Sequence, residues 1–263
     1  KKGRFLMNNG QRLSAIVLMS ACAVFPLTMD DVRNMSANTW LAVPSSKLQD
    51  SPVAAPNFLS AADMDRLRGN GFATIVEEWS GGIYDYKRDR LAIWGGGHNA
   101  WRGNEIYAFD LASMSWKRIT DPTLNPSNCT DINSDGTANS RHTYNGLSYI
   151  AHADQFFAKG GSLNCTGGTC GGATITWTFD FVLKHWTNRN PSGTIPRSDC
   201  GNSSAYDPVS KKVFFGVTSS SGGMFSYNYD ANTWTKHTSD DYYYYTMAVD
   251  DKRGFLTVVG EGN

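Results

Sequence analysis

The stretch IYAFDLASMSWKRI at residues 106–119 decides the fold. In it an alternating strand pattern is followed by an Asp, a short turn and a Trp. It recurs as ITWTFDFVLKHWTNR at 175–189 and as MFSYNYDANTWTKH at 224–237. The matching tryptophans are Trp116, Trp186 and Trp234. Alternation with a period of two predicts strands, and the Asp with its short turn predicts antiparallel hairpins.

A second half-unit accompanies these copies: an aromatic or apolar residue with Asp, a charged turn, an apolar strand and then Gly. It reads YDYKRDRLAIWGGG from Tyr84, YDPVSKKVFFGV from Tyr206 and VDDKRGFLTVVG from Val249, with a looser copy at 149–161. A sheet of four such strands buries both faces only against neighbouring sheets. Radial stacking of these sheets predicts a propeller, with roughly 40–50 residues per blade.

The paired glycines that end an apolar strand (IWGGG, FAKGG), followed by aromatic–Asp and Trp, resemble the kelch repeat family. The resemblance covers roughly residues 79–263 and implies an all-β fold, a kelch-type β-propeller of the galactose-oxidase-like superfamily. Two blades depart from the pattern, because Lys159 precedes one glycine pair and Gly216-Val217 replaces another.

The repeats predict about three and a half blades of four antiparallel strands, fewer than the roughly four to eight of a closed ring. We therefore expect a fragment with an incomplete ring, truncated at its C-terminus, and with apolar side chains exposed on both open flanks. Residues 37–40 (ANTW) repeat residues 231–234, which predicts a closing outer strand near 38–44 within an N-terminal segment at 24–78. We expect a short helix at 60–67, capped by Ser60.

Residues 1–23 have the layout of a secretory signal, with a basic start and the apolar run LSAIVLMSACA at 13–23. The sequence around Cys22 also resembles a lipobox, so membrane attachment is expected only through a lipid anchor at Cys22. We expect a secreted, periplasmic or cell-surface protein. Without residues 1–23, 20 basic and 24 acidic residues remain, and this mildly acidic balance argues against a nucleic-acid partner.

Export makes disulfides the expected state of the four cysteines beyond residue 23, for which three pairings exist. We predict Cys165–Cys170, because it closes a short loop, and Cys129–Cys200. A zinc site is disfavoured, because the cysteine spacings contain no CxxC and no His lies near any Cys.

The long loops fall on one face of the predicted propeller, where a rigid scaffold presents binding residues. Aromatic rings there stack on sugars, and polar side chains orient them. The candidate ligand-binding residues are His98, Asn99, Trp101, Arg141, His142, Tyr242 and Tyr243. The loop DINSDG also matches the first half of a calcium loop, so Asp131, Asn133 and Asp135 are candidate calcium ligands, although the acid expected at its end is replaced by His142.

No catalytic site is assignable from these residues. The main interpretation is an exported propeller scaffold that binds a carbohydrate or a protein ligand. The alternative is a galactose-oxidase-like copper radical oxidase whose active-site blades are missing, which would need a free Cys cross-linked to a Tyr and two His as ligands. A sugar-processing lyase or isomerase needs clustered carboxylates or basic residues that the sequence does not place together.

Overall fold

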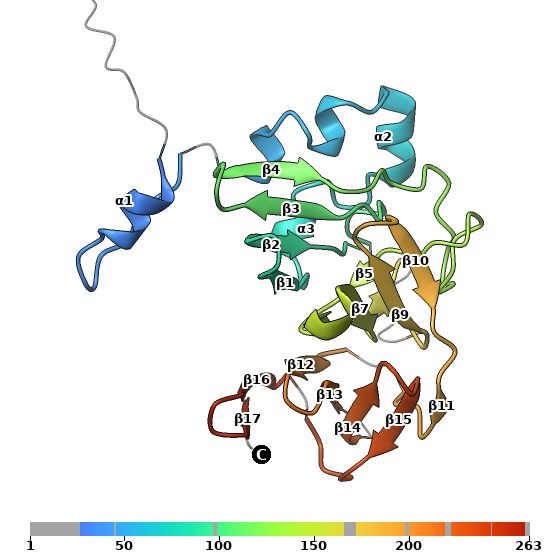
Figure 1. Ribbon diagram of the computed structural model, residues 1–263. Helices are drawn as coiled ribbons and strands as arrows, with labels where there is room; N and C mark the ends of the chain where they lie inside the picture. The colour runs from blue at the N-terminus through green and yellow to red at the C-terminus, as the bar shows by residue number, and fades with distance from the viewer. Residues whose placement is uncertain are drawn as a thin grey trace, which may run out of the picture.

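The computed structural model describes residues 27–44, 46–96, 99–165, 172–197, 200–218, 222–242 and 244–260. It consists mostly of strands in antiparallel sheets, with few and short helices (Figure 1). The helices are α1 (Met29–Arg33), α2 (Ala61–Leu67) and α3 (Thr74–Glu77), and 3-10 turns lie at Leu48–Asp50, Ala55–Asn57 and Ala151–Ala153. Not one of these described helices has the length and apolar character needed to cross a membrane.

Three sheets each contain an antiparallel meander of four strands, and the third sheet has a fifth strand at its edge. The first contains β1 (Gly82–Asp85), β2 (Arg90–Ile93), β3 (Tyr107–Asp110) and β4 (Ser115–Arg118), and the second contains β6 (Leu147–Ile150), β7 (Gln155–Lys159), β9 (Thr176–Asp180) and β10 (His185–Asn188). The third contains β12 (Ser203–Asp207), β13 (Lys212–Val217), β14 (Gly223–Asn228) and β15 (Thr233–Lys236), with the short β11 (Ser192–Gly193) parallel to β15. A hairpin of β16 (Thr246–Asp250) and β17 (Phe255–Val259) follows, and β5 (Arg141–His142) pairs with β8 (Ser162–Leu163).

The predicted antiparallel sheets are confirmed at the three repeats. Each fourth strand carries its tryptophan at the same place, one residue after the strand begins: Trp116 in β4, Trp186 in β10 and Trp234 in β15. The residue two positions before each of these tryptophans has a positive φ, which turns the chain back into the sheet. The local pattern of turn, then strand, then Trp therefore determines each meander.

The sheets are arranged in a propeller-like manner. Their first strands β1, β6, β12 and β16 lie side by side in this order, and the remaining strands run outward from them (Figure 1). The tryptophan of each later sheet packs on the sheet before it: the ring of Trp186 lies 4.7 Å from that of Trp94, and the Trp234 indole donates to Thr176 Oγ1 at 3.0 Å. These tryptophan contacts therefore join neighbouring sheets.

The outer flank of the first sheet is covered, which corrects the prediction that it would expose apolar side chains. Residues 46–77 pack over it, and Leu48, Leu67 and Ile75 form a buried cluster with Tyr107 of β3. The Trp116 indole donates to the Ser46 carbonyl at 2.6 Å. The N-terminal segment thus buries the face that a preceding sheet would cover in a propeller. At the opposite flank β17 exposes Phe255 and Val259, as predicted.

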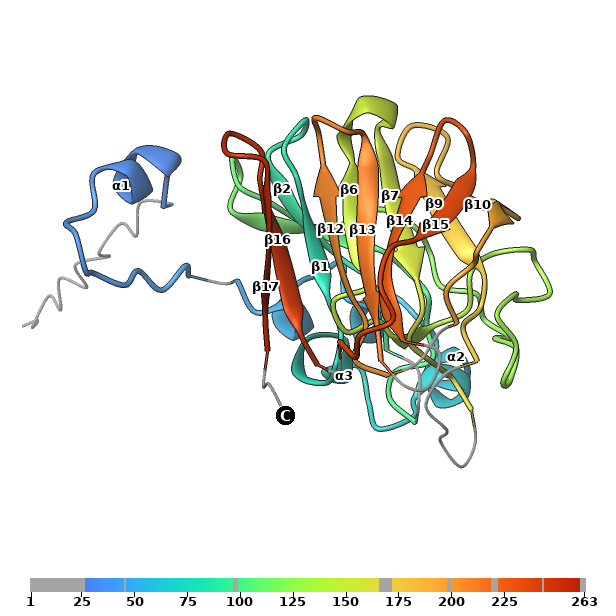
Figure 2. The same ribbon diagram turned by 90° about the horizontal axis from the view of Figure 1, so that it is seen from below.

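The helix predicted at 60–67 is confirmed, since α2 begins after Ser60, whose side chain accepts a hydrogen bond from the Asp63 N–H. Residues 38–44 form no strand, so the predicted outer strand is not present in this structure. Trp40 is 100% exposed, and α1 lies apart from the sheets in both views (Figures 1 and 2). The signal segment and Cys22 lie outside the described residues.

The two ends of the sheets are built differently (Figure 2). One end, here called the turn end, carries the tight turns within the hairpins, such as those joining β1 to β2 and β6 to β7. The other end, the loop end, carries α2, α3, the long loops between second and third strands, and the segments that enter each first strand. This agrees with the predicted location of the long loops.

Candidate functional site: an aromatic platform at the loop end

Each first strand is entered through a residue with left-handed backbone geometry. Trp79, Tyr144 and Tyr244 have φ values of 49°, 48° and 52°, and Gly201 has 75° at the corresponding place in the third sheet. A large aromatic residue in this conformation is uncommon and strained. Strain of this kind persists only where the surrounding structure maintains it, and it is typical of functional sites. Its repetition marks the segments that enter the first strands as a candidate site.

Three of these four residues bring their rings together. The ring centroids of Trp79 and Tyr144 lie 5.9 Å apart, those of Trp79 and Tyr244 lie 6.0 Å apart, and those of Tyr144 and Tyr244 lie 6.0 Å apart. We call this cluster the aromatic platform. Gly201 makes room for it, because a Cβ there would lie 3.1 Å from the Tyr244 ring. At this position the third sheet therefore has a glycine, which leaves space for the Tyr244 ring, and no fourth aromatic ring.

Main-chain hydrogen bonds between sheets hold the platform in place. The Tyr144 N–H donates to the Trp79 carbonyl at 2.8 Å, and the Asn145 N–H donates to the Asn202 carbonyl at 3.1 Å. Gly81 permits the first contact, since a Cβ there would lie 2.1 Å from the Tyr144 carbonyl oxygen. The platform is thus supported by backbone from three sheets.

The platform borders a pocket of about 240 Å³. The other described residues around the pocket are Ser80, Asn145, Gly201, Asn202 and Tyr245, and none of these carries a charge. Trp79 is 57% exposed and Tyr244 is 46% exposed, so both rings offer apolar surface to solvent. Rings about 6 Å apart touch one another and leave no space for a cation between them, so the accessible feature is their outer surface. The arrangement suits a flat, neutral ligand with hydroxyl groups.

Trp101 is a core residue, which corrects its assignment as a ligand-binding side chain. It is 0% exposed, packs edge-on against Phe72, and donates its indole N–H to Glu105 at 2.8 Å. Apolar packing on the N-terminal segment draws this ring inward. Burial raises the pKa of Glu105 to about 7, although hydrogen bonds from Trp101 and Tyr107 act in the opposite direction.

Arg141 and His142 are also buried and do not form an exposed site. Arg141 pairs with Asp131, whose carboxylate lies 2.6 Å from the guanidinium, and the ring of His142 packs edge-on to Tyr144. His142 therefore lies beneath the platform rather than on its surface.

The remaining candidates are scattered over the loop end. Asn99 lines a different pocket, beside α2. Tyr242 is partly buried, with its ring edge-on to Tyr245 and its hydroxyl 3.3 Å from Thr238 Oγ1. His98 and Tyr243 lie outside the described residues.

The three candidate calcium ligands are engaged in hydrogen bonds within the protein. Asp131 accepts from Arg141, from the Ile175 N–H at 2.7 Å and from the Trp177 indole at 2.9 Å. Asn133 accepts from the Ser127 N–H, and the exposed Asp135 accepts from Thr123 and Thr137. Within the part of the chain that the structure describes, no group of three His, Cys, Asp or Glu side chains forms a metal site. Calcium binding stays a prediction, and Asp131 organises the loop without it.

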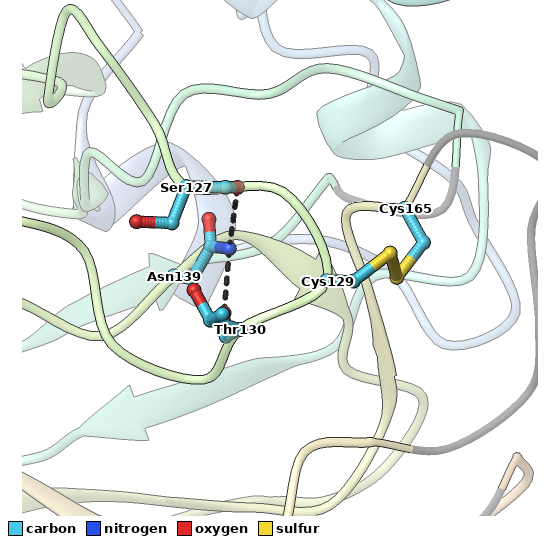
Figure 3. Close-up of a disulfide and its surroundings, with 5 residues drawn as sticks. All are labelled: Ser127, Cys129, Thr130, Asn139 and Cys165. Carbon is cyan, nitrogen blue, oxygen red and sulfur yellow. Dashed lines mark hydrogen bonds between the residues drawn. A yellow bond between two sulfur atoms is a disulfide. The ribbon is translucent and has the colours of Figure 1, made fainter.

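Both predicted disulfide pairings are wrong, because Cys129 pairs with Cys165 (Figure 3). Their Cα atoms are 4.6 Å apart, and the Cys129 N–H donates to the Asn164 carbonyl at 2.9 Å. The loop around Cys129 is held by Asn139, whose amide donates to the carbonyls of Ser127 and Thr130 (Figure 3). This folding of the 127–139 loop, and not closeness in sequence, selects the partner.

Cys200 is also disulfide-bonded. All three described cysteines are therefore in disulfides. The copper radical oxidase would need a free one, so these residues give that alternative no support.

The sequence analysis did not identify Trp79, Tyr144 or Tyr244 as site residues, although Tyr244 directly follows the candidates Tyr242 and Tyr243. Its signal is a repeated tripeptide in which an aromatic residue is followed by a small polar residue and Gly. It reads Trp79-Ser80-Gly81 before β1 and Tyr144-Asn145-Gly146 before β6.

No protein-family model matches the chain, and no curated protein matches it. Among solved structures, the chain is similar to TolB from Acinetobacter baumannii at 13% sequence identity and a TM-score of 0.41. The similarity covers 68% of this chain and 37% of the TolB chain.

Proposed function

We propose that this protein is an exported, kelch-type propeller scaffold that binds carbohydrate on the aromatic platform. The observation that carries the proposal is the convergence of Trp79, Tyr144 and Tyr244 from three sheets on one uncharged pocket. Sugar rings have apolar faces that stack on aromatic side chains and a rim of hydroxyls that hydrogen-bond to polar ones. The pocket offers both.

The size of the pocket favours one ring of a longer saccharide. Its volume of about 240 Å³ lies below the range of roughly 300–1,000 Å³ that is usual for drug-sized ligands. The exposed outer faces of Trp79 and Tyr244 lie beside it, so adjoining sugar residues would extend over the platform. A protein ligand is the alternative, and the absence of glycan binding in the test below would favour it.

The kelch type and the export are supported by separate features. Gly95 and Gly96 after β2, and Gly160 and Gly161 after β7, have positive φ, as the paired glycines of that repeat require. A Cβ at Gly96 or Gly161 would also lie 2.1 Å from a carbonyl oxygen. Disulfides persist in oxidising compartments, so the bond between Cys129 and Cys165 supports export.

A glycan array probed with the purified chain, followed by calorimetric titration of the neutral oligosaccharides that bind, tests the proposal. We expect Trp79→Ala and Tyr244→Ala each to weaken binding about fivefold or more, since stacking of one ring contributes roughly 1 kcal/mol or more. Trp40→Ala is the matched control, because Trp40 is exposed but lies away from the platform. The absence of glycan binding to the folded chain, or equal losses in the Trp40 and Trp79 variants, contradicts the proposal.

A further inference from the structure

The three rings of the aromatic platform do not lie in one plane. The angle between the ring planes is 38° for Trp79 and Tyr244, 51° for Trp79 and Tyr144, and 69° for Tyr144 and Tyr244. Trp79 and Tyr244 are the exposed pair, whereas Tyr144 is half-buried. A ligand therefore meets two exposed rings that are tilted against each other, and not one flat floor.

The surrounding structure fixes this tilt. The left-handed backbone at Trp79 and Tyr244 sets the direction in which each side chain leaves the main chain. The Tyr144 hydroxyl lies 3.3 Å from Oγ of the buried Ser162, which holds that ring from below. Gly201 leaves just enough space for the Tyr244 ring, since a Cβ there would lie 3.1 Å from it. The angle between the exposed rings is therefore a property of the fold.

The tilt determines which physical form of a saccharide gains contact with both exposed rings. Stacking depends on contact between faces, and a gap of about 0.5–1 Å already forfeits a quarter to a half of the dispersion attraction. A rigid flat surface that lies on the Trp79 indole meets Tyr244 at 38°, so it touches only one edge of that ring. The face of crystalline cellulose or chitin is such a surface, because its chains are locked side by side. It would gain one stacking contact from the platform.

A single saccharide chain in solution does not have this restriction. Rotation about its glycosidic bonds lets successive sugar rings lie in different planes, so one ring can stack on Trp79 and another on Tyr244. Its hydroxyls are also free to hydrogen-bond to the polar side chains around the pocket, such as Ser80 and Asn145. In a crystalline polysaccharide those hydroxyls are already bonded to neighbouring chains.

We propose that the platform has two stacking subsites, one on Trp79 and one on Tyr244, which bind rings of one flexible saccharide chain and discriminate against crystalline polysaccharide faces. This inference rests on the proposed carbohydrate function and adds to it the physical form of the ligand. The specificity determinant is the angle between the two rings, and Tyr144 is the positioning residue beneath them.

Soluble and solid forms of the same neutral polymer test the discrimination. The pairs are cellohexaose with microcrystalline cellulose, chitohexaose with crystalline chitin, and mannohexaose with crystalline mannan, together with the soluble oligosaccharides that bind on the glycan array. Calorimetry measures the soluble probes, and depletion of the protein from solution measures the solids. We expect any solid to be bound at least about fivefold more weakly than the best soluble saccharide, because the second stack contributes roughly 1 kcal/mol.

The dependence of affinity on chain length tests the two subsites. From the monosaccharide to the trisaccharide of the best soluble ligand, we expect the affinity to rise about fivefold or more, since only the longer chain reaches both rings. Trp79→Ala and Tyr244→Ala should each remove most of this rise. Trp40→Ala, at an exposed tryptophan away from the platform, is the matched control and should retain it.

The outcomes separate this inference from the function on which it rests. If the folded chain binds no glycan in any form, the proposed function fails and the inference fails with it. If soluble saccharides bind but the solid form of the same polymer is retained equally well, only the inference is overturned. An affinity that does not rise from monosaccharide to trisaccharide overturns it as well. If a platform variant does not fold, the wild-type comparison of soluble and solid probes decides.

Discussion

The turn end and the loop end of the same sheets differ in the side chains that join neighbouring sheets. At the turn end the joints are charged and polar. Arg88 after β1 donates to both oxygens of Asp154 after β6 at 2.7 Å, and Lys87 adds a contact at 2.6 Å. Between the second and third sheets, His152 lies 2.8 Å from the Tyr206 hydroxyl and 3.2 Å from Asp230.

At the loop end backbone hydrogen bonds join the segments that enter the first strands, and the aromatic side chains of these segments line a pocket. The entry segments of β1 and β6 bond to each other through main-chain atoms, which leaves Trp79 and Tyr244 exposed. The two ends therefore differ in role. Side chains at the turn end connect neighbouring sheets, whereas side chains at the loop end form a surface that is open to a ligand.

The largest expected effect concerns Asp131, which holds the loop end together from inside. Asp131→Asn leaves Arg141 buried without a counter-charge, and we expect it to lower the free energy of unfolding by about 3–5 kcal/mol. Urea denaturation followed by tryptophan fluorescence measures this change. Asp135→Asn, in the same loop but exposed, is the control and should cost less than about 1 kcal/mol. Equal effects of the two substitutions would show that the loop has no buried hub.

The next effect is a pH dependence from Glu105, below the first sheet's loop end. Its pKa is raised from 4.5 to about 7, so the folded state holds this proton more tightly than the unfolded state does. Stability from this group is fully present below pH 4.5 and is lost as the pH rises through 7, by about 3 kcal/mol.

Glu105→Gln cannot ionise, so its unfolding free energy should fall less between pH 5 and pH 8 than that of the wild type. Denaturation curves at several pH values measure both slopes. Parallel slopes for the wild type and the variant would contradict the raised pKa.

A smaller effect is expected from the charged joint at the turn end. Burial alone would raise the pKa of Asp154, but hydrogen bonds from Arg88, Lys87 and Tyr149 lower it well below its ordinary 3.8. We expect Asp154→Asn to cost about 1 kcal/mol at pH 7, because the joint is partly exposed, and to leave glycan binding unchanged. The difference should begin to shrink as the pH falls below 3.8, where the unfolded chain takes up a proton on this carboxyl group, and should disappear only below the lowered pKa of the folded state.

Asp110→Asn is the control for this joint, since its partner Lys117 lies in the same sheet. A loss of glycan binding in Asp154→Asn would show that the two ends are not separate in function.

The smallest effect on stability should come from the platform itself. Trp79→Ala removes an exposed ring from a strained backbone position, and we expect the unfolding free energy to change by less than about 1 kcal/mol while glycan affinity falls. Thermal melting and calorimetric titration of the same sample measure both quantities. A large loss of stability would mean that the platform is packing and not a presented surface.

Local sequence pattern determined most of the sheet structure. The alternation within β3, β9 and β14 and the turn before each repeated Trp act within one hairpin, so their result is readable from neighbouring residues. The Ser60 cap of α2 is equally local. The calcium-like loop at 131–136 shows the limit of such a pattern, because its spacing suggested a cation while its first carboxylate is held by Arg141.

The sequence by itself therefore determined the antiparallel meanders, the strand that carries each tryptophan, and the end where the long loops gather. Only the tertiary structure decided that Cys129 pairs with Cys165, that Trp101 is buried, that residues 46–77 cover the first sheet, and that Trp79, Tyr144 and Tyr244 meet. The physical reason is range. Hydrogen-bonded turns and alternation are decided over a few residues, whereas contacts between loops depend on how whole sheets stack, and the entropy of loop closure discriminates only weakly between near and distant partners.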